Sequence, residues 1–140
     1  MSSAERLKPE TLHWQLYEII DPSTTIPSFR GGPFRGWIRE TYRGVDKPRF
    51  SEIMKDSVRR NQIIRSEFIE HFPSETTLTG LRVGQDIVII EGMHRCCAVT
   101  LAAEQGRPVR SRIQIALAEY PSLDIPLLGH VIPENENARH

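Results

Sequence analysis

Cysteine is scarce in this chain, and its two cysteines, Cys96 and Cys97, are neighbours. Adjacent cysteines do not easily reach ordinary disulfide geometry, and no C-x-x-C spacing offers the thiolate pairs of a structural zinc site. The histidines His13, His71 and His130 stand alone, without the spacing of metal ligands. We therefore expect no structural disulfide and no metal site built from protein ligands.

An excess of charge of one sign is also missing, because 18 Lys and Arg residues balance 18 Asp and Glu residues. Unspecific affinity for duplex DNA comes from neutralising phosphates, so this balance disfavours a protein that coats DNA. No apolar run approaches the roughly 18 residues that a membrane-spanning helix needs. Residues 1–9 contain no apolar segment of a secretory signal. We expect a cytoplasmic protein with no membrane partner.

The chain has 140 residues, of which 39% are hydrophobic, as expected of a single domain with one core. Periodicity and turn residues predict an α/β (α+β) domain over residues 1–140, with a small mixed sheet and flanking helices. The polar ends, residues 1–9 and 129–140, are expected to be flexible. We predict strands over 13–20, 63–72, 86–90 and 109–117, helices over 50–60 and 93–105, and a polar loop over 73–85.

Residues 24–47 are rich in Pro, Gly, Arg and aromatic side chains, and they predict a long irregular loop. Long loops of this kind usually carry function. One interpretation is a clamp that closes over an anionic substrate through Arg30, Arg35 and Arg39. The other is a wrap whose aromatic side chains fill the edge of the core while its arginines remain solvated.

The most informative segment is the predicted strand–turn–helix from residue 87 to 109. Gly92 ends the strand, and His94 and Arg95 stand in the first helical turn. The first amides of a helix lack partners within the helix, and the helix dipole favours negative charge there. Arg95 adds a planar cation suited to phosphate, and His94 adds a donor that can also move protons. Glu91 either orients a ligand or acts as a base, or it merely bounds the helix start.

The residues Gly92, Met93, His94, Arg95 and Ala98, followed by Gly106 before the next strand, resemble the second motif of the ParB/sulfiredoxin-like superfamily. The upstream helix is similar as well, because Ile53, Ser57 and Val58 match a family pattern that precedes a strand. The resemblance covers residues 46–118 and implies a ParB/sulfiredoxin-like fold.

The resemblance further implies a nucleotide, ATP or ADP with Mg²⁺, bound at this helix start. By resemblance the nucleotide is held by Gly92, Met93, His94, Arg95, Cys96 and Ser57, and chemistry is carried by His94, Arg95 and Glu91. Sulfiredoxins keep their catalytic cysteine directly before the His-Arg pair, where this chain has Met93, so reduction of sulfinic acid is not expected. ParB proteins usually carry two arginines where this chain has His94-Arg95.

Cys96 and Cys97 have two interpretations, because a helix start lowers the pKa of a thiol whereas cysteines on an Ala/Leu-rich helix are usually small core residues. Ser57 likewise reads as a satisfied hydroxyl on the apolar face of its predicted helix.

The leading hypothesis is a nucleotide-binding domain that transfers or hydrolyses a phosphate group on a small molecule, as a small-molecule kinase or nucleotide hydrolase does. The alternative is a non-catalytic module, either regulatory or binding nucleic acid through the loop arginines with Arg107, Arg110 and Arg112. The balanced charge disfavours nucleic acid.

Overall fold

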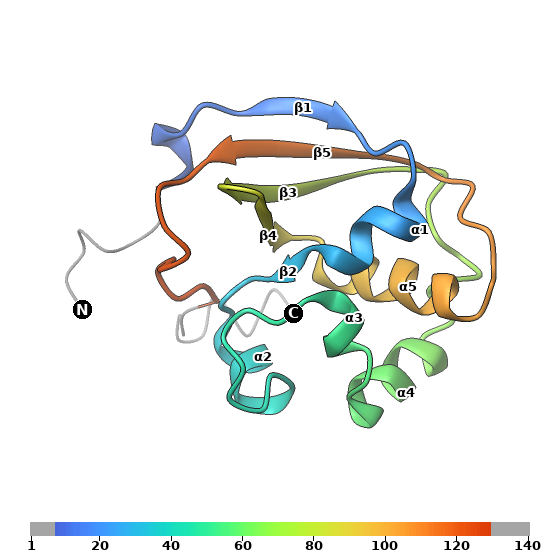
Figure 1. Cartoon of the computed structure of the whole chain (residues 1–140). Helices are drawn as coiled ribbons and strands as arrows, with labels where there is room; N and C mark the ends of the chain where they lie inside the picture. Colours follow the sequence, from blue (N-terminus) through green and yellow to red (C-terminus); the bar gives the residue numbers. More distant parts are fainter. Residues whose placement is uncertain (1–7, 130–140) are drawn as a thin grey trace, which may run out of the picture.

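A computed structural model describes residues 8–129, and within them five strands form one mixed sheet (Figure 1). The sheet order is β1-β5-β3-β4-β2. β3 is parallel to β5 and antiparallel to β4, while β1 pairs antiparallel with β5 and β2 pairs parallel with β4. The strands are β1 Gln15–Glu18, β2 Arg30–Gly31, β3 Glu75–Val83, β4 Asp86–Glu91 and β5 Arg112–Glu119.

In the view of Figure 1, most of the helices lie below the sheet, and β1 forms its top edge. The longest of the described helices, α5, contacts α1, α3, α4 and the turn η3. The chain is therefore an α+β fold with a mixed sheet and flanking helices, as predicted. The helices are α1 Pro22–Thr25, α2 Arg35–Glu40, α3 Phe50–Ile53, α4 Ser57–Arg65 and α5 Met93–Glu104, and the 3₁₀ turns are η2 Pro9–Thr11 and η3 Ile26–Ser28.

The larger of two apolar clusters joins the sheet to α5. Leu78, Ile89 and Ile113 project from three neighbouring strands and are almost fully buried. Side chains alternate along a strand, so their neighbours point to the other face of the sheet. There Leu81 and Val88 form a smaller cluster. Complete burial of such a side chain contributes about 1.5–3 kcal/mol, so both faces stabilise the sheet.

The predicted strand–turn–helix is confirmed. The strand over 86–90 is β4, and the helix over 93–105 is α5. Gly106 follows the end of α5 with a φ of +70°, the conformation that favours glycine after a helix. The strands predicted over 13–20 and 109–117 exist as β1 and β5, although β5 begins later than expected.

The single helix predicted over residues 50–60 is wrong, because the structure has two helices there, α3 and α4. Asp56 separates them, since its carboxylate accepts a hydrogen bond from the Arg59 amide at 2.9 Å and starts α4. Ser57 and Val58 are consequently exposed, and Arg59 and Ile63 form the buried face of α4. The predicted apolar face does not continue beyond Met54, because the carboxylate of Asp56 caps the start of a new helix.

The strand predicted over 63–72 and the polar loop predicted over 73–85 are also wrong. α4 continues to Arg65 and is followed by turns, whereas β3 occupies Glu75–Val83. β3 is rich in threonine, which looks polar by composition but is β-branched and suits a strand between two partners. Pairing with both β4 and β5 therefore makes residues 75–83 a strand and not a loop.

Residues 24–47 are not one irregular loop. They contain η3, β2 and α2, and the aromatic side chains of Phe29 and Tyr42 are buried in the larger cluster. The Tyr42 hydroxyl donates a hydrogen bond to the Gly32 carbonyl at 2.7 Å. Most of the ends expected to be flexible, residues 1–9 and 129–140, lies outside the described residues.

Candidate functional site

The first turn of α5 begins at Gly92, which directly follows β4. Gly92 has a φ of +107°, and its carbonyl accepts the first helical hydrogen bond, from the Cys96 amide at 3.0 Å. The amides of Met93, His94 and Arg95 precede that bond, so they belong to the positive end of the helix. No side chain caps this end, and the first turn contains no acidic residue.

Gly92 is required by both conformation and packing. A φ of +107° lies in the region that L-residues rarely adopt. A Cβ atom at this position would lie 2.5 Å from Leu78 Cδ2 and 3.2 Å from Arg95 Nη2. The space beside the α-carbon is thus occupied by the protein itself, and a ligand would approach this helix start from the side of the amides.

Arg95 lies over this helix start and is bound to β3. Its Nη1 donates hydrogen bonds to the Thr76 hydroxyl and, at 3.0 Å, to the Thr77 carbonyl. A cation next to the positive end of a helix is unfavourable by about 0.3–1 kcal/mol, and an anion between them reverses the sign. The contacts with β3 hold the guanidinium in this position. The sequence alone does not indicate that Arg95 binds Thr76 and Thr77, which are 19 and 18 residues away.

Glu91 is exposed at the end of β4, and its Oε1 accepts a hydrogen bond from the Thr79 hydroxyl at 3.0 Å. The bond fixes the carboxylate against β3, at the end of β4 from which α5 starts. Met93 is buried, and its side chain packs towards Gly31, so it offers a ligand only its backbone.

His94 packs against α2 through Trp37. The two ring centroids are 5.3 Å apart in an edge-to-face arrangement. The guanidinium of Arg59 lies 3.7 Å from the centre of the Trp37 ring. Desolvation, and then the charge of Arg59, lower the pKa of His94 below its ordinary value of 6.5. His94 is therefore neutral at pH 7 and keeps one N–H donor and one nitrogen acceptor.

Arg59 is the unexpected member of this cluster, because it is buried and no carboxylate among residues 8–129 pairs with its guanidinium. Its side chain donates to the Thr41 hydroxyl at 3.2 and 2.9 Å and to Gln62 Oε1 at 2.7 Å. Weakly hydrated guanidinium stacks on aromatic faces, which explains the contact with Trp37. The sequence did not predict the contact between Arg59 and Trp37, because α2 and α4 meet only in the folded chain.

Of the expected nucleotide-binding residues, Ser57 has other surroundings than predicted, and Cys96 has its side chain in the core. Ser57 is the exposed first residue of α4, not a hydroxyl on a buried face. The Cys96 amide donates its hydrogen bond to the Gly92 carbonyl within the helix, and the Cys96 thiol is fully buried beside Cys97. Burial first, and then the neighbouring Cys97, raise the pKa of the Cys96 thiol well above its usual range. Burial raises the pKa of Cys97 to about 12. Both cysteines are core residues, as one of the two interpretations held.

The three arginines expected in the substrate clamp lie on two different elements, Arg30 on β2 and the other two on α2. Arg30 pairs with Asp86 at 3.1 Å and donates to the Lys47 carbonyl at 3.0 Å, so it joins β2 to β4. Arg35 and Arg39 are exposed on α2, where Arg39 pairs with Glu40 at 3.2 Å. Because residues 24–47 are folded onto the core, they do not form a loop that closes as a unit.

Two other groups of charged side chains lie away from the start of α5. Glu67, Glu70 and His71 place ligand atoms within 4.8 Å of one another, but all three are exposed. Arg107 lies 4.0 Å from Glu70, and Arg112 lies 3.6 Å from acidic side chains on β1 and β3. Between residues 8 and 129, no helix has the length and apolar character required to cross a membrane.

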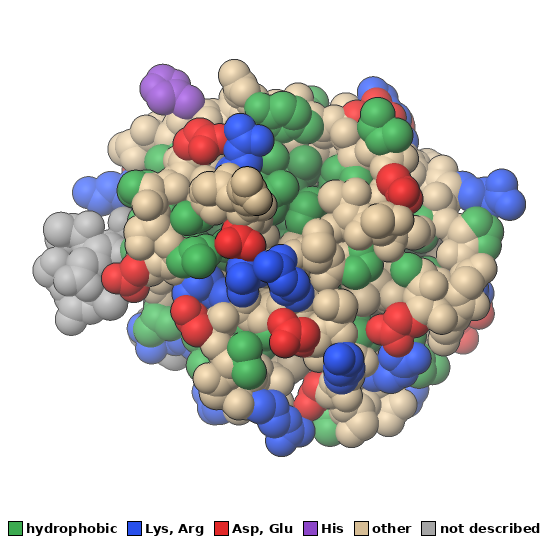
Figure 2. Space-filling model, in the orientation of Figure 1, with side chains coloured by type: hydrophobic (Ala, Val, Ile, Leu, Met, Phe, Trp, Pro, Cys, Tyr) green, Lys and Arg blue, Asp and Glu red, His purple; other side chains and the backbone are tan. Residues whose placement is uncertain are grey.

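Acidic and basic side chains are interspersed over the face of the molecule in Figure 2. Comparison of the chain with family models, with curated proteins and with solved structures finds no match in any of the three.

Proposed function

We propose that the first turn of α5 binds the phosphate groups of a nucleotide, with ATP or ADP the expected ligand. One observation carries this proposal: no side chain caps this helix start and its first turn has no acidic residue, yet a guanidinium is held beside it by β3. An anion is the group that both the helix end and Arg95 attract. The resemblance to ParB/sulfiredoxin-like domains supports a nucleotide as the source of that anion.

In this proposal the amides of Met93, His94 and Arg95 donate to phosphate oxygens, and Arg95 neutralises their charge. His94, which is neutral at pH 7, donates one hydrogen bond or accepts a proton. Glu91 is the nearby carboxylate that would orient a ribose or act as a base. Mg²⁺ would enter with the nucleotide and share in neutralising its phosphates.

The reaction class that suits this arrangement is phosphotransfer, or hydrolysis of a phosphate ester, on a small molecule. Such reactions depend mainly on positioning and charge neutralisation. The substrate side belongs to α2, because Trp37 from that helix contacts His94. Arg35 and Arg39 lie on the same helix with exposed side chains and would meet an anionic substrate.

The test is calorimetric titration of the chain with Mg-ATP, Mg-ADP, Mg-CTP and inorganic phosphate. A charge-assisted hydrogen bond contributes about 1.5–3 kcal/mol, so Arg95→Ala should weaken nucleotide binding roughly tenfold to a hundredfold. Arg39→Ala is the matched control, since it removes the same charge from an exposed position. Circular dichroism must first show that both variants are folded. Equal losses in the two variants would refute the site at α5.

A salt titration separates this proposal from binding of nucleic acid, which weakens steeply as salt is added. Of the three arginines offered for nucleic acid, Arg107 and Arg112 already face carboxylates, so they form no open basic patch with Arg110. We expect no measurable affinity for single- or double-stranded oligonucleotides at physiological salt. Tight, steeply salt-dependent binding of an oligonucleotide would replace the nucleotide proposal.

A further inference from the structure

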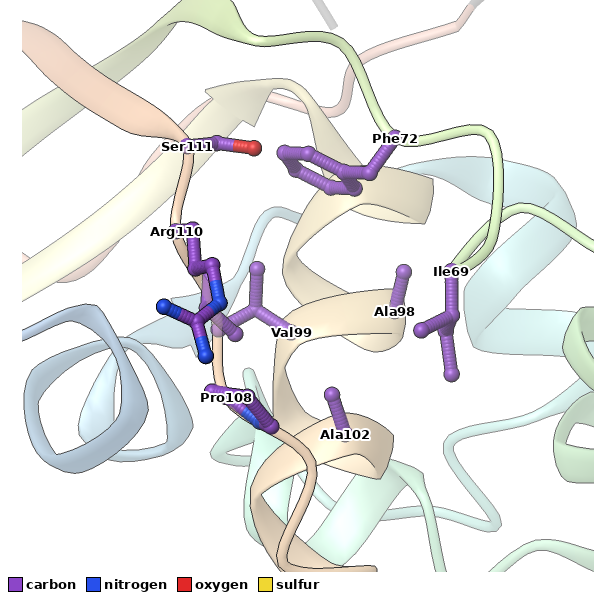
Figure 3. Close-up of a pocket in the computed structure, with 9 residues that line it drawn as sticks. Ile69, Phe72, Ala98, Val99, Ala102, Pro108, Arg110 and Ser111 are labelled. Carbon is purple, nitrogen blue, oxygen red and sulfur yellow. The ribbon is translucent and has the colours of Figure 1, made fainter.

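A second candidate site lies on the flank of α5, away from its first turn. Figure 3 shows a cavity whose floor is the helix, at Ala98, Val99 and Ala102. Ile69 and Phe72, from the turns after α4, form one wall, and residues 108–111 form the other. The small alanine side chains leave a volume of about 120 Å³.

The lining is apolar except on one side. Arg110 and Ser111 provide the polar side chains, and none of the described residues that line the cavity is a carboxylate. Arg110 is exposed and forms no ion pair or hydrogen bond with any residue from 8 to 129. The hydroxyl of Ser111 also lacks a hydrogen bond within that range, and it points towards Phe72 in Figure 3. The neighbouring arginines on this segment and on β5, Arg107 and Arg112, face acidic residues instead.

We propose that this cavity binds a small monocarboxylate whose body is a compact branched or aromatic hydrocarbon. An apolar cavity of about 150 Å³ in another protein accepts benzene, so this smaller cavity, of about 120 Å³, suits a hydrocarbon group no larger than a benzene ring. Ligand sites are typically apolar pockets with a few polar groups that fix orientation. Here the guanidinium of Arg110 pairs with the carboxylate, and the hydroxyl of Ser111 donates to it. A larger or doubly charged acid does not suit one cation above an apolar floor.

The cavity is separate from the nucleotide site, because neither Arg95 nor any other residue of the first turn of α5 lines it. A nucleotide also does not suit the cavity, whose volume of about 120 Å³ is too small for a base with its ribose. The two sites nevertheless share α5, so the cavity ligand and the nucleotide contact the same helix at different places.

Benzoate is the test ligand, and benzamide is its neutral control of nearly the same shape. Two-dimensional ¹H–¹⁵N NMR of the full chain should show shifts at the amides of Ala98, Val99, Ala102, Arg110 and Ser111 as benzoate is added. Benzamide should bind at least about tenfold more weakly, because it lacks the charge that pairs with Arg110.

Arg110→Gln should weaken benzoate binding about tenfold while leaving benzamide binding unchanged. Arg65→Gln is the matched control, since Arg65 is also exposed and its side chain also lacks a polar partner in the described chain. Arg110 is on the surface, so its substitution is not expected to affect folding. Ala102→Val should weaken both ligands by filling the floor of the cavity.

The proposal is overturned if benzoate causes no shifts at these amides, if benzamide binds as well as benzoate, or if Arg110→Gln binds benzoate like the unmodified chain. Titration of Mg-ATP into Arg110→Gln keeps the two sites apart. Unchanged nucleotide affinity supports two separate sites, whereas a loss in that variant would overturn their independence.

Discussion

Two helices of this chain, α4 and α5, begin in opposite ways. α4 begins after Asp56, whose carboxylate accepts from the Arg59 amide at 2.9 Å and pairs with Arg43 at 2.9 Å. α5 begins after Gly92, which has no side chain to offer, and the guanidinium of Arg95 lies 3.2 Å from where a Cβ atom of this residue would be. Every helix start attracts negative charge. α4 receives that charge from its own sequence, and α5 does not.

The difference explains why the start of α5, and not that of α4, is a candidate ligand site. A cap made by the chain satisfies a helix start and closes it to other anions. At α5 the same position is occupied by glycine in a tight strand-to-helix turn against Leu78, so no side chain at that position supplies a negative charge. The predictions that follow test whether these two starts differ as much as their geometry indicates.

The largest effect is expected from Gly92→Ala. The new Cβ atom would meet Leu78 in a backbone conformation that alanine resists, so we expect the free energy of unfolding to fall by about 2–4 kcal/mol. The control is Gly36→Ala in α2, where a Cβ atom meets nothing within 4 Å. That variant should gain about 0.5–1 kcal/mol, because it removes a flexible residue from a helix. Urea denaturation measures both, and a loss at Gly92 no larger than the change at Gly36 would contradict the packing described.

Asp56→Ala should have the second largest effect, a loss of about 1–2 kcal/mol of stability as the cap of α4 is removed. Burial raises the pKa of Asp56, but the hydrogen bond from the Arg59 amide and the contact with Arg43 outweigh it and lower the pKa below 3.8. The cap therefore contributes fully above pH 3.8 and is lost as the pH falls through the lowered pKa.

The control for this cap is Asp21→Ala. Asp21 precedes α1 in the same position, but its side chain makes no capping hydrogen bond. We expect its loss to stay within about 0.5 kcal/mol. Denaturation curves at neutral and acidic pH measure the free energy of unfolding of both variants. If Asp56→Ala and Asp21→Ala lose the same stability at neutral pH, the carboxylate of Asp56 is not what starts α4.

A smaller effect is expected on the titration of His94. Arg59→Met removes the charge that is the second cause of the lowered pKa, while desolvation remains, so the pKa of His94 should rise part of the way towards 6.5. Arg60→Met, which removes an arginine paired with Glu104, is the control and should leave the pKa unchanged. NMR titration of the His94 ring protons reports both, and an unchanged pKa in Arg59→Met would refute the coupling across Trp37.

His94 also predicts a pH dependence of stability. Because its pKa is lower in the folded chain than in the unfolded chain, the unfolded chain binds the proton first. This residue's contribution is complete above pH 6.5 and declines as the pH falls from there to its lowered pKa. Comparison of the unmodified chain with His94→Gln in this pH range isolates the contribution of His94, and a stability difference that grows as the pH falls below 6.5 would contradict the sign.

The smallest effect is expected from the two cysteines on nucleotide binding. Both thiols are buried in the core and are kept protonated by burial. Cys96→Ala and Cys97→Ala should therefore keep nucleotide affinity within about twofold, or about 0.4 kcal/mol, of the unmodified chain. The measurement is the same calorimetric titration. A large loss of affinity in a folded variant would return the thiols to the site.

The sequence predicted β4 and α5 well because their signals are local. A short β-branched run, a glycine and an Ala/Leu-rich segment follow one another without interruption. The prediction failed between residues 50 and 85, where two longer-range effects compete with pattern. A capping aspartate divided one expected helix, and pairing on both sides made a strand of the threonine-rich segment.

By itself the sequence determined the helix start at Gly92, with His94 and Arg95 in its first turn, since a helix start depends on consecutive residues. Only the tertiary structure decided what surrounds it. Arg95 donates a hydrogen bond to Thr76, which precedes it by 19 residues. Arg30, expected in the substrate clamp, instead pairs with Asp86, 56 residues further on. Side chains so far apart meet only when the sheet forms, because strand pairing and burial, not local pattern, choose their partners.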